Sequence, residues 1–179
     1  MTGRMRRVLK MALFAGVAIV LVMQVFRPAR TNPPVDPART LQASAHLSPE
    51  VAAIFDRACL DCHSYQTRWP WYTEVAPVSW FIANHVAQGR RHMNFSQWPE
   101  KPKVQNHDLA EICEQVKRGE MPLSSYLWIH RGSRLAPGEA EAICAWTKSE
   151  QERLAPLLAS AVPAGTPGAD AVSGPPPRP

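Results

Sequence analysis

The sequence lacks several features that would point directly to a function. It has no internal repeat of the kind that builds solenoids. Its central part has no excess of basic residues, because positions 48–155 hold 12 Lys or Arg and 13 Asp or Glu. The net charge of +5 therefore comes from the two flanks. Nucleic-acid binding needs a basic surface on the folded domain, so we expect no nucleic-acid partner.

Cysteine is scarce, and only two of the four cysteines are close together. Cys59 and Cys62 are followed at once by His63, which gives the C-x-x-C-H signature of c-type haem attachment. In this chemistry the two thiols bond the edge of the porphyrin and the imidazole binds the iron. A redox dithiol and half of a zinc site are the alternatives. No βαβ pattern and no second closely spaced Cys/His pair accompanies the motif, so we favour one covalently bound haem c.

The other two cysteines, Cys113 and Cys144, lie on the expected buried faces of two helices. In an oxidising compartment an even number of cysteines favours pairing. We favour a disulfide over two separate buried thiols.

The N-terminus combines a basic cluster with an apolar segment. Arg4, Arg6, Arg7 and Lys10 precede or begin the segment Val8–Phe26. As a helix of 1.5 Å per residue, that segment would be about 28 Å long, near the hydrocarbon thickness of a bilayer. We expect a single-pass transmembrane anchor with the remaining chain on the far side of the membrane. A cleaved signal peptide is the alternative, but no small-x-small site follows the segment.

The remaining chain divides into three parts. Residues 27–47 are rich in proline and are expected to form an extended linker. Residues 48–155 show helical spacing of apolar side chains and helix-capping signals, which predict one all-α domain. Residues 156–179 are dominated by Ala, Pro and Gly and are expected to be disordered.

Within the domain we expect a helix from Ser48 to the C-x-x-C-H motif, with Ser48 as its N-cap. A second helix is expected from Pro77 to about Gln88, with Gly89 as its stop. A third should be capped by Asn106 or His107, after an exposed loop at 101–103, and should end before Gly119. The last helix is expected from Pro137 to about Leu154.

The sixth iron ligand is open among several side chains. Met121 is favoured because it follows the glycine stop and precedes Pro122 in a loop. His92 and Met93 are the main alternatives. Among nearby residues, Arg68 is a candidate partner for a haem propionate, since its guanidinium matches a carboxylate. Trp69 is a candidate wall of the haem edge.

These motifs together resemble the bacterial haem-binding domain family, a cytochrome c-like group. The stretches that carry the resemblance span about residues 48–150 and are Cys59–Ser64, Trp69–Tyr72, Val75–Val86, Gly89–Trp98, Glu111–Cys113, Gly119–Tyr126 and Cys144–Trp146. The resemblance implies an exported mono-haem domain with His63 as proximal ligand. With the N-terminal anchor, it implies a single-pass protein of the bacterial inner membrane with the haem domain in the periplasm.

Three functions are compatible with such a domain. We favour a membrane-anchored one-electron carrier with His63 and Met121 on the iron, acting with redox partner proteins and not as an enzyme. A haem-based sensor or ligand-binding module with an exchangeable sixth ligand is the alternative. A peroxidase-type enzyme, using His92 and the Arg90–Arg91 pair, is the least favoured.

Overall fold

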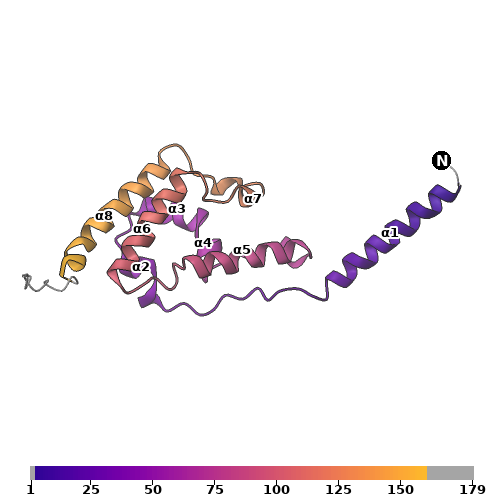
Figure 1. Ribbon diagram of the computed structural model, residues 1–179, viewed down its shortest axis with the longest axis horizontal. Helices are drawn as coiled ribbons and strands as arrows, with labels where there is room; N and C mark the ends of the chain where they lie inside the picture. Colours follow the sequence, from indigo (N-terminus) through magenta and orange to yellow (C-terminus); the bar gives the residue numbers. More distant parts are fainter. Residues whose placement is uncertain (1–2, 161–179) are drawn as a thin grey trace, which may run out of the picture.

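The computed structural model describes residues 3–160, and this part of the chain is all-helical without a strand. Figure 1 shows one long helix, α1 (Gly3–Met23), extending away from a body that contains the other helices. The body is built from α2 (Leu41–Ser44), α3 (Pro49–Ala58), α4 (Leu60–His63), α5 (Val78–His92), α6 (Pro102–Lys117), α7 (Ser124–Leu127) and α8 (Glu139–Ser160). This part of the chain also has three 3-10 turns: η1 (Pro37–Arg39) before α2, η2 (Trp71–Glu74) between α4 and α5, and η3 (Arg131–Ser133) between α7 and α8. The expected all-α class is confirmed.

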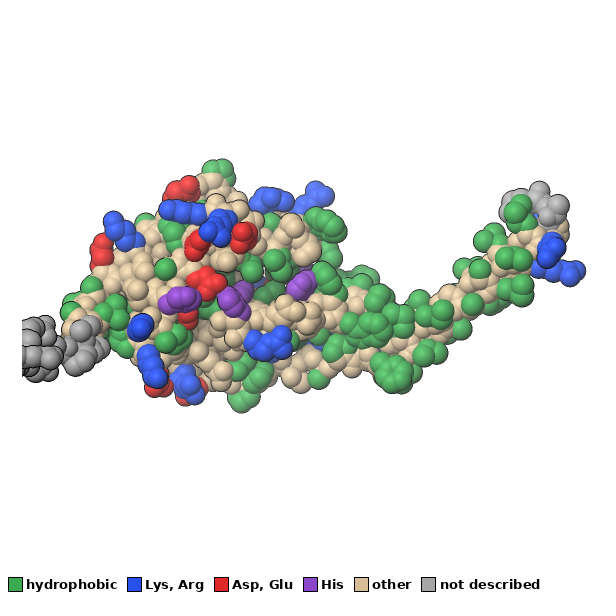
Figure 2. Space-filling model, viewed as in Figure 1, with side chains coloured by type: hydrophobic (Ala, Val, Ile, Leu, Met, Phe, Trp, Pro, Cys, Tyr) green, Lys and Arg blue, Asp and Glu red, His purple; other side chains and the backbone are tan. Residues whose placement is uncertain are grey.

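The hydrophobic side chains of α1 are exposed along its length (Figure 2). Among residues 3–160, no helix is both long and apolar enough to cross a membrane. The expected membrane-spanning helix over Val8–Phe26 is thus not supported. The helix begins at Gly3 and ends at Met23, so it includes the basic residues at its start and excludes the last apolar residues, Val25 and Phe26.

The segment expected to be a linker is partly built into the domain. Leu41, in α2, is fully buried, and its amide donates to the backbone oxygen of Phe95 at 2.8 Å. The indole of Trp146 donates to the backbone oxygen of His46 at 3.0 Å. The folded domain therefore begins near Pro37 and not at Ser48, because an apolar side chain of this segment completes the core.

The core lies between α3, α6 and α8. Phe55 of α3 contacts the ring of Trp146 of α8 nearly edge-on, with centroids 5.3 Å apart. The helices α6 and α8 run along each other, and the expected disulfide between Cys113 and Cys144 is confirmed, with Cα atoms 4.8 Å apart. This covalent bond joins the two longest helices of the body.

Helix α6 begins earlier than expected. Lys101 occupies the N-cap position and Pro102 the first helical position, so residues 101–103 are not a loop. Proline is pre-organised for that position, where its missing N–H costs no helical hydrogen bond. The start is held by Gln105, whose buried amide donates to the backbone oxygen of Pro99 at 2.5 Å.

Helix α8 continues past the expected end at Leu154 and includes Pro156. Leu154 is buried, and Leu158 packs against the core one turn later. This packing extends the helix to Ser160 despite the proline. The start of the segment expected to be disordered, 156–160, is therefore helical, and its remainder, 161–179, lies outside the described residues.

Candidate haem site

The C-x-x-C-H motif sits on a short helical turn after α3. Ser48 caps α3 as expected, its hydroxyl accepting from the amide of Val51 at 3.2 Å. Cys59 ends that helix, and Leu60–His63 form α4, in which the amide of His63 donates to the backbone oxygen of Cys59 at 3.0 Å. One turn of helix thus carries both thiols and the imidazole.

Both thiols of the motif are free, in contrast to the bonded pair Cys113–Cys144. Burial, with a smaller contribution from Cys62, raises the pKa of the Cys59 thiol to about 12. Burial, with a smaller contribution from Asp61, raises the pKa of Cys62 to about 11. The two side chains are therefore neutral thiols at neutral pH.

The ring of His63 is held in one tautomer by the backbone. Its Nδ1 lies 3.0 Å from the backbone oxygen of Met93. A carbonyl oxygen can only accept, so Nδ1 carries the proton and Nε2 keeps its lone pair. Burial lowers the pKa of His63, which also favours the neutral ring. A metal-binding histidine has this arrangement, with one nitrogen anchored and the other available.

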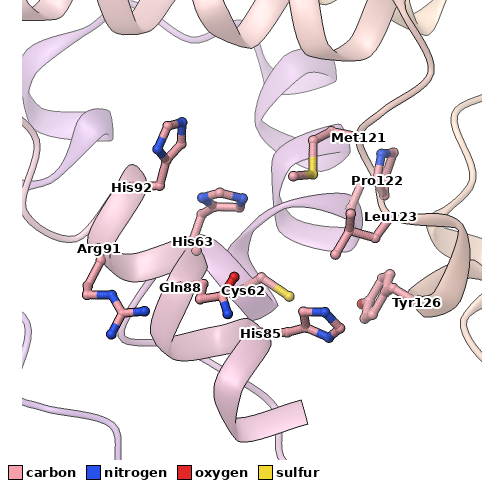
Figure 3. Close-up of a pocket in the computed structure, with 12 residues that line it drawn as sticks. Cys62, His63, His85, Gln88, Arg91, His92, Met121, Pro122, Leu123 and Tyr126 are labelled. Carbon is pink, nitrogen blue, oxygen red and sulfur yellow. The ribbon is translucent and has the colours of Figure 1, made fainter. Parts of the chain in front are cut away.

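His63 faces a cavity of about 590 Å³, which is in the usual size range for a cofactor site. The cavity lies between two groups of side chains (Figure 3). Gln88, Arg91 and His92 of α5 line one side, and Met121, Pro122, Leu123 and Tyr126 line the other. Cys62 and His63 lie between the two groups, and a smaller apolar cavity of about 110 Å³ shares His63 and Met121 and reaches Cys59.

Met121 is placed by the end of α6. Gly119 has φ +67°, a left-handed conformation that glycine adopts without strain. The amide of Gly119 donates to Val116 and that of Glu120 to Gln115, the pattern of a Schellman motif. The glycine stop expected here is confirmed, and it turns the chain so that Met121 lies across the cavity from His63 (Figure 3).

The sequence pattern of the haem-binding domain matches residues 18–149. The chain belongs to this family. No curated protein and no solved structure matches the chain.

The residues around the cavity of this haem-binding domain fit a haem. An imidazole nitrogen with a free lone pair and a thioether sulfur are two common axial ligands of haem iron, and both line one cavity. Of the two free thiols of the same motif, Cys62 lines this cavity and Cys59 lines the smaller cavity, which His63 and Met121 also line. Residues 3–160 contain no cluster of three or more His, Cys, Asp or Glu placed to hold a metal ion.

The alternative sixth ligands are placed less favourably in the haem-binding domain. His92 lines the cavity, but its Nε2 lies 2.6 Å from a carboxylate oxygen of Glu111. Met93 lines only the smaller cavity, where its side chain is buried in the core. His85 also lines the large cavity and packs edge-on against Phe81, with ring centroids 4.2 Å apart.

Arg68 and Trp69 are not brought to the large cavity. The guanidinium of Arg68 is bonded to Asp61, with Nε 3.0 Å from the carboxylate, and also pairs with Asp56. The indole of Trp69 donates to the side chain of Asn32 at 3.2 Å. The arginine that lines the cavity is Arg91. The cavity-lining residues His85, Gln88 and His92 are spaced three and four apart in the sequence, and this helical spacing could have predicted the face of α5 that borders the cavity.

Gly89 has a different role from the helix stop expected of it. Helix α5 continues through Gly89 to His92. A Cβ atom at Gly89 would lie 2.6 Å from the backbone oxygen of Cys62. The glycine therefore allows α5 to approach the haem motif closely, which brings Arg91 and His92 to the cavity.

Proposed function

We propose that the protein is a c-type cytochrome that carries one electron at a time. Cys59 and Cys62 bond the haem covalently, His63 is the proximal ligand and Met121 is the sixth ligand. The observation that carries the proposal is the pair of axial donors: the available Nε2 of His63 and the thioether of Met121 line the same cavity. The haem supplies a reversible Fe(III)/Fe(II) couple, and the chain supplies its ligands, its apolar surroundings and its orientation.

A carrier role, and not catalysis, is supported by the chemistry around the cavity. A filled sixth position leaves no open iron site for a substrate. His92, the side chain that a peroxidase-type mechanism would need, is engaged by Glu111, and Arg90 is engaged by backbone and side-chain oxygens outside the cavity. A sensor with an exchangeable Met121 is the second candidate, supported by the position of this methionine on a loop and not within a helix.

We further propose that the domain works outside the cytoplasm, at the inner membrane, with Val8–Phe26 associating with the bilayer. The basic cluster before this apolar segment supports the orientation. The disulfide supports an oxidising compartment. Cell fractionation and protease accessibility of the full chain test this proposal, and a cytoplasmic pool that carries the haem would contradict it.

Spectroscopy of the exported full-length protein tests the haem assignment. We expect the haem to stay bound through denaturation in acid and organic solvent, because it is covalently attached. We expect a low-spin spectrum with the long-wavelength charge-transfer band of thioether ligation, lost in Met121→Ala. Met11→Ala, at an exposed position of α1, is the matched control. A high-spin wild type that binds carbon monoxide readily would favour the sensor, and loss of the low-spin spectrum in His92→Ala would assign the ligand to His92.

A further inference from the structure

Two tryptophans are almost fully exposed on the body of the protein. Trp71, at the start of η2, is 78 % exposed, and Trp128, at the end of α7, is 79 % exposed. Ile129 beside Trp128 is 63 % exposed. Single exposed apolar residues are common, but large aromatic residues in one patch are typical of a binding surface.

The two segments that carry these tryptophans are held together. The hydroxyl of Tyr72 lies 2.7 Å from Nε2 of His130. Trp71 packs against Tyr72 in an edge-on contact with ring centroids 5.9 Å apart. His130 directly follows Ile129 in the chain, so this hydrogen bond brings Trp71 and Ile129 to the same region of the surface.

The α7–η3 part of this region has one sign of charge, whereas Glu74 of η2, near Trp71, is paired with Arg30. Residues 121–138 contain two arginines, Arg131 and Arg134, and no Asp or Glu. Both arginines are exposed, and neither forms an ion pair among the described residues. With Trp128 they line a shallow depression on the surface. Where Figure 1 places α7, Figure 2 shows basic and hydrophobic side chains together at the edge of the body.

This segment is rigidly positioned. Arg57 of α3 donates to the backbone oxygens of Gly132 and Arg134, both at 2.9 Å. Its own charge is paired with Glu139, so the charges of Arg131 and Arg134 remain uncompensated. A surface that is already ordered binds a partner with a smaller loss of conformational entropy.

The segment also borders the haem cavity. The ring of Tyr126 stacks on that of His130, with centroids 4.0 Å apart and planes 15° apart. Tyr126 lines the cavity that His63 and Met121 share. A protein bound over Trp128 and Arg131 would therefore lie close to the haem.

We propose that Trp71, Trp128, Ile129, Arg131 and Arg134 form a docking surface for an acidic electron-transfer protein. The two unpaired guanidiniums complement acidic side chains, and tryptophan and arginine are the residues that most often dominate binding energy at interfaces. A second copy of this chain is disfavoured, because a two-fold contact would place arginines against arginines. The partner is oxidised by one electron while the iron is reduced from Fe(III) to Fe(II), without proton transfer. This inference rests on the proposed carrier function.

Stopped-flow reduction of the full-length holoprotein by reduced flavodoxin, a small acidic one-electron donor, tests the docking surface. We expect the second-order rate constant to fall as ionic strength rises. Arg131→Glu/Arg134→Glu should lower it at least tenfold at low salt and remove the salt dependence. Trp128→Ala should weaken flavodoxin binding in calorimetry at low salt. Lys101→Glu/Lys103→Glu, which makes the same charge change at exposed positions of the α6 start, is the control.

The outcomes separate the docking surface from the carrier function. Reduction by dithionite should be equal in all variants, and failure of wild type to cycle between Fe(III) and Fe(II) would contradict the carrier function itself. If the wild type cycles but the two arginine substitutions change the rate no more than the lysine control, the docking surface is wrong. Equal binding of the arginine variant and wild type to anionic phosphatidylglycerol vesicles is also expected, and a loss of binding confined to that variant would assign the patch to lipid.

Discussion

The Nδ1 atom of His63 lies 3.0 Å from the backbone oxygen of Met93, so this imidazole, the proposed haem ligand, is oriented by the main chain and not by a side chain. The side chain of Met93 packs into the core, 7 % exposed. We predict that Met93→Leu, a substitution of similar volume, leaves the haem spectrum unchanged and costs less than about 1.5 kcal/mol of stability. Absorption and magnetic circular dichroism spectra measure this, and loss of the thioether band would make Met93 the sixth ligand.

The contact between Gly89 and Cys62 predicts a large effect from one methyl group. In Gly89→Ala the added Cβ would meet the Cys62 oxygen at 2.6 Å, so α5 or α4 must shift. We expect a loss of about 1–3 kcal/mol in the free energy of unfolding and a lower haem content per protein. Gly132→Ala is the control, since no atom lies within 4 Å of its Cβ position. Equal melting temperatures of the two variants would contradict the close approach.

The disulfide between Cys113 and Cys144 should contribute to stability without affecting the haem. For a sequence separation of 31 residues, chain entropy predicts about 3–4 kcal/mol. We expect Cys113→Ser/Cys144→Ser to lose this amount of unfolding free energy, and therefore to unfold at a lower urea concentration, with an unaltered haem spectrum. An unchanged urea midpoint would show that the bond does not constrain the unfolded chain.

The pairing of Arg57 with Glu139 predicts a pH dependence of stability. The hydrogen bond from Arg57 lowers the pKa of Glu139, so the carboxylate stabilises the fold above its unfolded pKa. This contribution is lost as the pH falls through the lowered value in the folded state. We expect Glu139→Gln to be less stable than wild type at pH 7, and the difference to shrink once the pH falls below the unfolded pKa of about 4.3 and to vanish below the lowered pKa of the folded state. Glu141→Gln, on the exposed side of the same helix turn, should show no such trend.

Arg90 forms hydrogen bonds that connect the segment before the domain, at Thr31 and Asn32, to the chain that directly follows the C-x-x-C-H motif. It donates to the backbone oxygens of Thr31 and Ser64, at 2.9 and 2.8 Å, and to the side chains of Asn32 and Thr67. We expect Arg90→Ala to release residues 27–36 and to accelerate tryptic cleavage after Arg30 at least several-fold. Arg118→Ala, at an exposed surface pair, controls for the lost charge. Unchanged cleavage would mean that other contacts hold the segment.

Local signals predicted local structure well. The Ser48 cap, the C-x-x-C-H turn and the Gly119 stop each depend on neighbours within a few residues, and all three are found. The role of Gly89 was misjudged because it depends on a partner that only the fold defines. The sequence marks Gly89 as a helix stop but does not reveal the Cys62 backbone beside it. Arg68 is bonded to Asp61 of the C-x-x-C-H motif, a contact that was not predicted from the sequence, and its role toward a haem propionate stays a prediction.

The extent of the domain was underestimated at both ends for a related reason. A proline-rich composition predicts a linker at 27–47 and a break at Pro156, but the burial of Leu41 and the packing of half-buried Leu158 against the core outweigh these local preferences. Composition indicates only the conformation that a segment prefers in isolation. Whether the segment becomes part of the folded domain depends on the contacts that its side chains make with the core.

The burial of Leu41 also has a mechanical consequence. Its amide is bonded to the backbone oxygen of Phe95, and the amide of Phe95 donates to the backbone oxygen of His63 at 2.7 Å. Two hydrogen bonds therefore connect the N-terminal segment to the main chain of the proposed iron ligand. Tension applied along residues 27–40 would be borne by the same backbone that sets the position of the imidazole.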